Sequence, residues 1–169
     1  MKVIAALSLA AIAALTPTPS LKSEITKSQN MVTKYMKAKD LGKLEKVLRE
    51  GTTADFKYVE GGKEEGFDDM WMSMKMGLDG MTKITECTTR VTDVKMEGDM
   101  GWCKDHHHMM GMMMGQDKKK HKMSFDGVSA DTFMKVDGKW KMSRMEWVSQ
   151  TIKMDGKKVD PAQMMGGGN

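Results

Sequence analysis

The chain has 169 residues and a mass of 18.9 kDa, which corresponds to one domain of ordinary size. Charged residues make up 30% and apolar residues 40% of the sequence, a balance that excludes wholesale disorder, a collagen-like repeat and a polytopic membrane protein. The formal net charge is +4, and the basic run at 118–122 has no alternating aromatic residues, so no nucleic-acid partner is expected. The composition is unusual in one respect, because 22 residues are methionine.

The first twenty residues have the layout of a secretory signal peptide. Lys2 gives a positive start, residues 3–15 form an apolar run, and residues 16–20 end it with Thr, Pro and Ser. This run of thirteen residues, apolar except for Ser8, is shorter than the roughly 20 residues needed to span a bilayer, so stable membrane insertion after cleavage is not expected. An uncleaved N-terminal anchor is the alternative. The sequence therefore predicts a secreted or periplasmic protein.

Helical spacing of apolar residues predicts three helices in the first half of the mature chain. The first runs from Leu21 to about Lys39, the second follows Asp40 as its N-cap and stops at Gly51, and the third covers 67–80. A short strand is expected between the second and third helices, at 54–59. The helices therefore precede most of the predicted β-structure.

From residue 82 onward the period changes to two, which is typical of strands. We expect strands at 82–95, 100–109, 121–136 and 139–154, with a loop at 110–119 and a Gly-rich tail at 160–169. Asp137-Gly138 favours a tight hairpin turn. Helices followed by one antiparallel meander predict an α+β domain over 21–159, with three helices packed on one face of a strongly curved sheet.

The expected hairpins fix a register for the sheet. If Glu97-Gly98 is a two-residue turn, Cys87 lies opposite His108 and far from Cys103 along the ladder, so two free thiols are expected instead of a disulfide. In the hairpin at Asp137-Gly138, the same counting places Phe133 opposite Met142. It also places Asp131 opposite Arg144, which would give this carboxylate a charged partner.

Several short segments resemble the nuclear transport factor 2-like superfamily, in its SnoaL-like and ketosteroid-isomerase-like branch. The resemblance covers about 21–159, and its carriers are Tyr35–Leu41, Ala54–Phe56, Val91–Val94 with Glu97–Asp99, and Asp131–Trp140. It implies a cone-shaped domain with an interior cavity, and it implies a homodimer, because members commonly pair through the sheet. Since this fold carries many activities, the resemblance does not by itself name a reaction.

The resemblance also implies where a site would lie. Tyr35 looks like the donor tyrosine of the ketosteroid-isomerase-like pattern, and Asp131 looks like its protonated donor aspartate. The base is expected near 56–59, where the chain has no carboxylate, and Asp55 falls on the other face of the strand. We therefore expect a non-catalytic module that binds a small apolar ligand without a cofactor. The residues expected to line its cavity are Tyr35, Phe56, Trp71 and Asp131. A small isomerase or hydrolase is an alternative.

The segment 106–114 reads HHHMMGMMM and suggests a different class of function. Thioethers suit Cu(I), and imidazoles suit copper or zinc, so a periplasmic copper-binding protein is a second alternative. Its candidate ligands are His106, His108, Met109, Met110 and Met112. Adjacent histidines of a strand point to opposite faces, so His106 and His108 are the pair that could chelate together. Because methionine is also enriched elsewhere, flexible core filling is a competing explanation.

Overall fold

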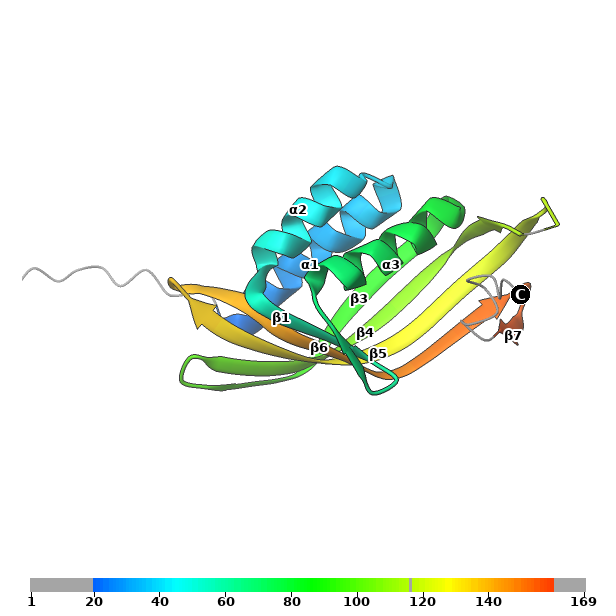
Figure 1. The fold of residues 1–169 in the computed structure, drawn as a ribbon. Helices are drawn as coiled ribbons and strands as arrows, with labels where there is room; N and C mark the ends of the chain where they lie inside the picture. The colour runs from blue at the N-terminus through cyan, green and yellow to red at the C-terminus, as the bar shows by residue number, and fades with distance from the viewer. Residues whose placement is uncertain (1–19, 116, 160–169) are drawn as a thin grey trace, which may run out of the picture.

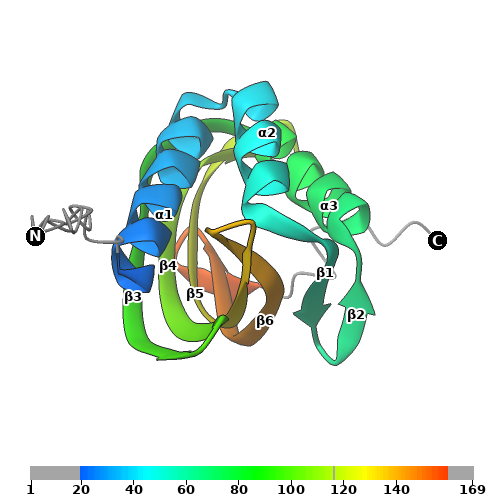
Figure 2. The same ribbon diagram turned by 90° about the vertical axis from the view of Figure 1, so that its left-hand side faces the viewer.

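The computed structural model describes residues 20–115 and 117–159, and these residues form three helices and one seven-stranded sheet. The three helices lie together over the sheet (Figure 1), and the long strands curl beneath them (Figure 2). This confirms the expected cone of three helices on a curved sheet. In chain order the elements are α1 (Leu21–Ala38), α2 (Leu41–Gly51), β1 (Thr52–Glu60), β2 (Lys63–Glu65), α3 (Phe67–Gly80), β3 (Met81–Glu97), β4 (Met100–Met114), β5 (Lys120–Val136), β6 (Lys139–Met154) and β7 (Lys157–Val159).

Local sequence explains the ends of the first two helices. Ser20, the last residue of the predicted signal peptide, is the N-cap of α1, and its hydroxyl accepts a hydrogen bond from the backbone N–H of Ser23. Lys39 ends α1 in the left-handed conformation, with φ of 52°. Asp40 caps α2 as predicted and accepts from the backbone N–H of Lys43.

None of the helices in the described ranges is long and apolar enough to cross a membrane. The rest of the predicted signal peptide and the predicted tail lie outside the described residues.

The sheet has the strand order β2-β1-β6-β5-β4-β3, with β7 added to β6. The four long strands β3 to β6 pair antiparallel in sequence order, as predicted. The expectation of a wholly antiparallel sheet is wrong, because β1 pairs parallel to β6, with Tyr58 opposite Met145. The intervening chain, which contains α3 and four strands, brings β6 back beside β1 in the same direction.

The predicted loop at 110–119 is also wrong, because β4 continues to Met114 and pairs with strands on both sides. Met109 and Met113 point inward against the core, and Gly111 between them allows close approach of β3. A Cβ at Gly111 would lie 2.3 Å from a backbone oxygen of β3. The segment lacks β-branched residues, so its local sequence gave no indication of the strand that tertiary packing imposes.

The β3–β4 register differs from the prediction by a small shift. Glu97 pairs with Met100, so the turn residues are 98 and 99, and Cys87 lies opposite Met109 instead of His108. A bulge lies between Thr92 and Lys95, where φ of Asp93 is 52°. Cys103 is six positions from Met109 along β4, and both cysteines are buried free thiols.

The β5–β6 register confirms one predicted pair and corrects the other. Phe133 lies opposite Met142, as expected. A register shift between Thr132 and Phe133 then places Asp131 opposite Met145, while Thr132 lies opposite Arg144. The predicted charge pair between Asp131 and Arg144 is therefore wrong, because the bulge turns the two side chains away from a common position.

The interior contains two apolar clusters. The larger cluster lies beneath α2 and α3, and Tyr35, Met36, Met74, Met109 and Met113 pack against it. Its buried members are Leu44, Trp71, Leu78, Met81, Ile84, Cys87 and Met123. The smaller cluster lies beneath the start of α1 and consists of Leu21, Ile25, Val91, Cys103 and Phe133. Methionine thus fills much of the larger cluster, in agreement with the core-filling interpretation.

Candidate functional site

A band of polar side chains crosses the inner face of the sheet between the two apolar clusters. Asp105 and His107 lie on β4, and Ser129 and Asp131 lie beside them on β5. We call these four residues the polar band. Inward-pointing positions alternate along each strand, so the band occupies two successive inner positions on both strands. The exposed fraction is 0% for Asp105 and Ser129 and 2% for Asp131, so the band is part of the core.

Asp105 is the better satisfied of the two buried carboxyl groups. The amide nitrogen of Gln29, on α1, donates to Asp105 Oδ2 at 2.6 Å, and the thiol of Cys103 lies 3.4 Å from Oδ1. Among the described residues, neither carboxyl oxygen of Asp131 has a hydrogen-bond partner of good geometry, although the neighbouring Ser129 hydroxyl acts to lower the pKa of Asp131. Burial and the negative charge of Asp105 raise the pKa of Asp131 well above its usual range. Burial also raises the pKa of Asp105, and the hydrogen bonds that Asp105 accepts lower this pKa and offset part of the rise.

The raised pKa of both carboxyl groups favours one shared proton, and Asp131, which has fewer donors than Asp105, is its expected holder. A protonated Asp131 can donate to Asp105, which accounts for one of its two oxygens. The other oxygen is a buried acceptor without a hydrogen-bond partner of good geometry among the described residues. Such an acceptor costs about 1–3 kcal/mol when it is buried without a donor.

His107 continues the band toward the larger cluster. Its Nε2 is hydrogen-bonded to Ser129 Oγ at 3.0 Å and its Nδ1 to Thr89 Oγ1 at 3.3 Å. Its ring meets the indole of Trp147 edge to face, with centroids 5.1 Å apart. Burial lowers the pKa of His107 to about 4, so the imidazole is neutral at physiological pH. The indole nitrogen of Trp147 in turn donates to the Tyr58 hydroxyl at 2.7 Å.

The four residues expected to line the cone occupy different parts of the interior. Tyr35 packs against the larger cluster that contains Trp71, and the ring of Phe56 meets that of Phe67 at a centroid distance of 6.3 Å. Asp131 belongs to the polar band. The described surface has one hollow along the exposed side of α1 and another on the outer face of the sheet, and none of the four residues lines either hollow.

The sequence analysis missed Asp105, Ser129, His107 and Gln29. Asp105 and His107 share the strand parity of Cys103, which places all three on one face. This alternation could have identified the band, but His107 was considered only as part of a histidine run. Gln29 could not be found in this way, because its contact with Asp105 joins residues 76 positions apart.

Two groups of residues could be considered for metal binding. Cys103, Asp105 and Asp131 bring one thiol and two carboxyl groups within 4.8 Å of one another. Because burial raises the pKa of Cys103 and of both carboxyl groups, a cation there would have to displace protons from poorly solvated groups. The other group contains the histidines and methionines predicted from segment 106–114.

The structure divides the predicted copper ligands between the two faces of β4. Met109 packs inward against the larger cluster, whereas alternation places His106, His108, Met110 and Met112 on the outer face. Met109 therefore cannot contribute to a site that contains His106 or His108. The outer hollow has a volume of about 440 Å³ and includes both histidines in its lining.

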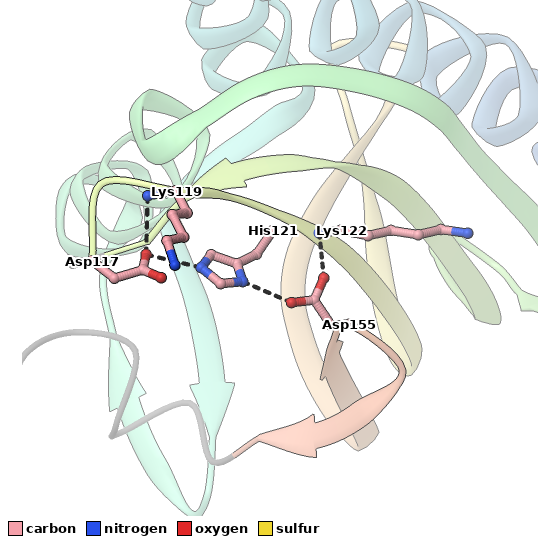
Figure 3. A network of polar contacts seen from close by, with 5 residues as sticks. All are labelled: Asp117, Lys119, His121, Lys122 and Asp155. Carbon is pink, nitrogen blue, oxygen red and sulfur yellow. Dashed lines mark hydrogen bonds and ion pairs between the residues drawn. The ribbon is translucent and has the colours of Figure 1, made fainter.

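A separate polar cluster lies where β5 begins, beside the β6–β7 turn (Figure 3). His121 Nδ1 contacts Asp155 Oδ2 at 2.7 Å and His121 Nε2 contacts Asp117 Oδ1 at 2.9 Å. The backbone N–H groups of Lys119 and Lys122 donate to the same two carboxylates. These contacts join the β4–β5 connection to the β6–β7 turn and raise the pKa of His121. The cluster is exposed and acts as a clamp between two loops.

Comparisons with known proteins identify the fold. No family model and no curated protein matches the sequence, but solved structures are similar. The Kfla4162 protein of Kribbella flavida has a TM-score of 0.59 and 10% identity, covering 75% of this chain and 90% of that chain. A proposed dehydratase of the NTF2-like family from Streptomyces avermitilis has a TM-score of 0.53 and 12% identity, with coverages of 73% and 92%. A proposed scytalone dehydratase from Novosphingobium aromaticivorans has a TM-score of 0.54 and 13% identity, with coverages of 76% and 84%.

These likenesses, together with the helix order and the curled sheet, define the class. The chain has the nuclear transport factor 2-like fold. This confirms the resemblance noted in the sequence at the level of the fold. At such low identity the neighbours carry no information about which ligand or reaction belongs to this chain.

Proposed function

We propose that the protein binds a small, largely apolar molecule inside the cone and recognises one polar group of that molecule with Asp131. The observation that carries this proposal is the buried carboxyl group without a donor at either oxygen. Native proteins seldom retain such a group unless something else depends on it. A bound hydroxyl group would supply the missing donor and would remove the energetic penalty.

The surroundings of Asp131 suit an apolar ligand. The polar band lies between two apolar clusters, so a ligand seated there would keep its hydrocarbon part dry while one oxygen meets the band. This arrangement matches the general form of small-molecule sites, in which a few polar groups orient a ligand within apolar walls.

Entry of a ligand requires the interior to rearrange, and the composition of the larger cluster favours this. Met36, Met74, Met109, Met113 and Met123 all contribute to it. Methionine side chains are unbranched and adapt to gaps of different shape. We therefore propose that these side chains move apart to admit a ligand, which gives the methionine excess a functional role.

The proposal is for binding without catalysis. The carboxylate closest to the position of the expected base is Asp55, which is exposed, while the next residue, Phe56, is 3% exposed and buried. His107 is held neutral, with both ring nitrogens hydrogen-bonded to hydroxyl groups. The solved structures described above include two proposed dehydratases, so the fold is compatible with small-molecule chemistry in other chains.

The test compares two probes of similar size, 2-naphthol and 2-methylnaphthalene, by equilibrium dialysis at pH 6. We expect the wild-type protein to bind 2-naphthol about three- to tenfold more tightly, which corresponds to one net hydrogen bond of about 0.5–1.5 kcal/mol. Asp131→Leu should abolish this preference while retaining affinity for 2-methylnaphthalene. Asp131→Asn should retain the preference, because the amide provides both a donor and an acceptor.

Two results would contradict the proposal. One is an absence of binding of both probes to the folded wild-type protein up to their solubility. The other is an equal preference for 2-naphthol in the wild type and in Asp131→Leu. Circular dichroism of each variant separates a lost site from a lost fold.

We also propose that residues 1–20 direct export. The support is the charged start, the apolar run and the break before Leu21. Fusion of these residues to a reporter that is active only outside the cytoplasm tests the proposal. A reporter that stays inactive, although the same reporter with an established signal peptide is active, would contradict it.

A further inference from the structure

The outer face of β4 presents a row of potential metal ligands that the proposed ligand-binding role does not use. His106, His108, Met110 and Met112 occupy alternate positions on this face. Neighbouring members of the row have Cα atoms about 6.8 Å apart, so two adjacent members can contact one ion, whereas all four cannot. The position of an ion along the row is therefore decided by the neighbouring strands.

Charge on the adjacent strands selects the middle of the row. His106 lies opposite Arg90 of β3, and Met112 lies opposite Lys83 and Lys122. These basic groups make both ends of the row unfavourable for a cation.

The middle of the row has acidic and hydroxyl neighbours instead. His108 lies between Thr88 and Asp126, and Met110 lies between Glu86 and Ser124. These two positions are therefore the part of the row where a cation meets no basic cross-strand partner.

The contacts of His108 have the geometry of a metal-binding imidazole. Its Nδ1 is 2.7 Å from Asp126 Oδ1, and its Nε2 is 3.8 Å from Glu86 Oε2. Histidines that bind metals usually donate their other N–H to a carboxylate, which fixes the tautomer and ring orientation. Two ligands at the usual 2.0–2.2 Å from a tetrahedral ion lie about 3.4 Å apart, so the observed gap needs only a small adjustment.

The side chains are also accessible in the way that a surface site requires. The side chain of His108 is 32% exposed, and that of Glu86 is 54% exposed. His108 and Asp126 both line the outer hollow. An ion can therefore reach the space between Nε2 and Glu86 from solvent without unfolding any part of the sheet.

We propose that His108, Met110 and Glu86 bind a copper ion on the outer face of the sheet, with Asp126 as the residue that positions the imidazole. The thioether of Met110 distinguishes copper from zinc, because soft sulfur ligands favour Cu(I). The site is separated from the polar band by the thickness of the sheet, so it does not depend on the proposed ligand.

The experiment is an anaerobic titration of the full-length mature protein with Cu(I) against a chromogenic chelator, with Zn(II) in a parallel arm. We expect one Cu(I) per chain. His108→Gln should weaken Cu(I) binding at least tenfold, and so should Met110→Leu, which preserves size but removes the thioether. Met110→Leu should leave the Zn(II) affinity within about twofold. Met76→Leu and His121→Gln are matched controls, since Met76 is 55% exposed on α3 and His121 lies in the loop clamp.

Asp126→Asn tests the positioning role. Loss of an outer carboxylate typically weakens metal binding 10- to 100-fold, and ¹⁵N NMR of the His108 ring should show a changed tautomer ratio in the metal-free variant. Cu(I) affinities of His108→Gln and Met110→Leu that equal those of the two controls would overturn the site. So would Zn(II) binding tighter than Cu(I) with no effect of Met110→Leu.

Discussion

Replacement of Asp131 by asparagine should change how the stability of the protein depends on pH. Burial and the charge of Asp105 raise the pKa of Asp131, so the folded state binds its proton more tightly than the unfolded state does. The stabilisation from this proton is complete below the unfolded pKa of about 3.9 and is lost as the pH rises through the folded pKa. Asparagine has the same shape, carries no titrating proton, and can donate to Asp105 at every pH.

The size of the effect follows from one proton held by one carboxyl pair. Between pH 3.9 and the folded pKa, each pH unit costs the wild type about 1.4 kcal/mol of unfolding free energy. With a typical urea m-value of about 2 kcal/mol per molar, each unit in this window lowers the unfolding midpoint by about 0.7 M. Asp131→Asn should lack this slope and should become the more stable protein as the pH rises.

Urea unfolding of both proteins at half-unit intervals from pH 4.5 to 8 measures this difference. Contributions from titrating groups that do not contact the Asp105–Asp131 pair, including His121, are common to both proteins and cancel in the difference. Asp55→Asn, at an exposed position of β1, is the matched control. Its unfolding free energy should depend on pH in the same way as that of the wild type. Parallel curves for the wild type and Asp131→Asn would refute the conclusion that Asp131 holds a proton in the folded protein.

Three further outcomes follow from the packing and the pKa values. Gly111→Ala should reduce the unfolding free energy by about 1–3 kcal/mol, because a Cβ there would lie 2.3 Å from a backbone oxygen of β3; an unchanged urea midpoint would contradict the register. Hydrogen bonds to Asp155 and Asp117 raise the pKa of His121, so the stability that His121 contributes is present below about pH 6.5 and is lost as the pH rises through the folded pKa. Urea midpoints of His121→Gln should lack this loss, and an identical pH profile would count against the clamp. Burial raises the pKa of Cys87 to about 11 and that of Cys103 further, so a disulfide reagent at pH 8 should label both thiols quickly in urea and very slowly in the native protein; fast native labelling would exclude the buried thiols.

The fold was largely predictable because its main determinants are local. Amphipathic spacing with Asp40 as a cap defined the helices, and Asp137-Gly138 defined one hairpin whose Phe133–Met142 pair is confirmed. The parallel contact of β1 with β6 and the extension of β4 to Met114 were not predictable in this way. Both depend on packing between distant parts of the chain, which periodicity does not report.

The candidate site was predictable only in part, for a related reason. Asp131 stood out through its resemblance to a donor aspartate. A single register shift between β5 and β6 removed its expected partner, Arg144, and the regular β4–β5 ladder places it beside Asp105. Counting residues from a turn assumes an unbroken ladder. Bulges break this assumption, and they are common near functional positions.

The alternation of β4 has a consequence for how this strand can change. Odd-numbered positions such as Asp105 and His107 are constrained by their contacts in the interior. Even-numbered positions such as His106 and His108 contact only solvent and the neighbouring strands. A shift of one residue would exchange the two sets, so burial of the odd-numbered side chains helps to fix the register of β4. Residues of the outer row can therefore be substituted one at a time, which can create, alter or remove an ion-binding site. The inner-face residues of the same strand keep their contacts.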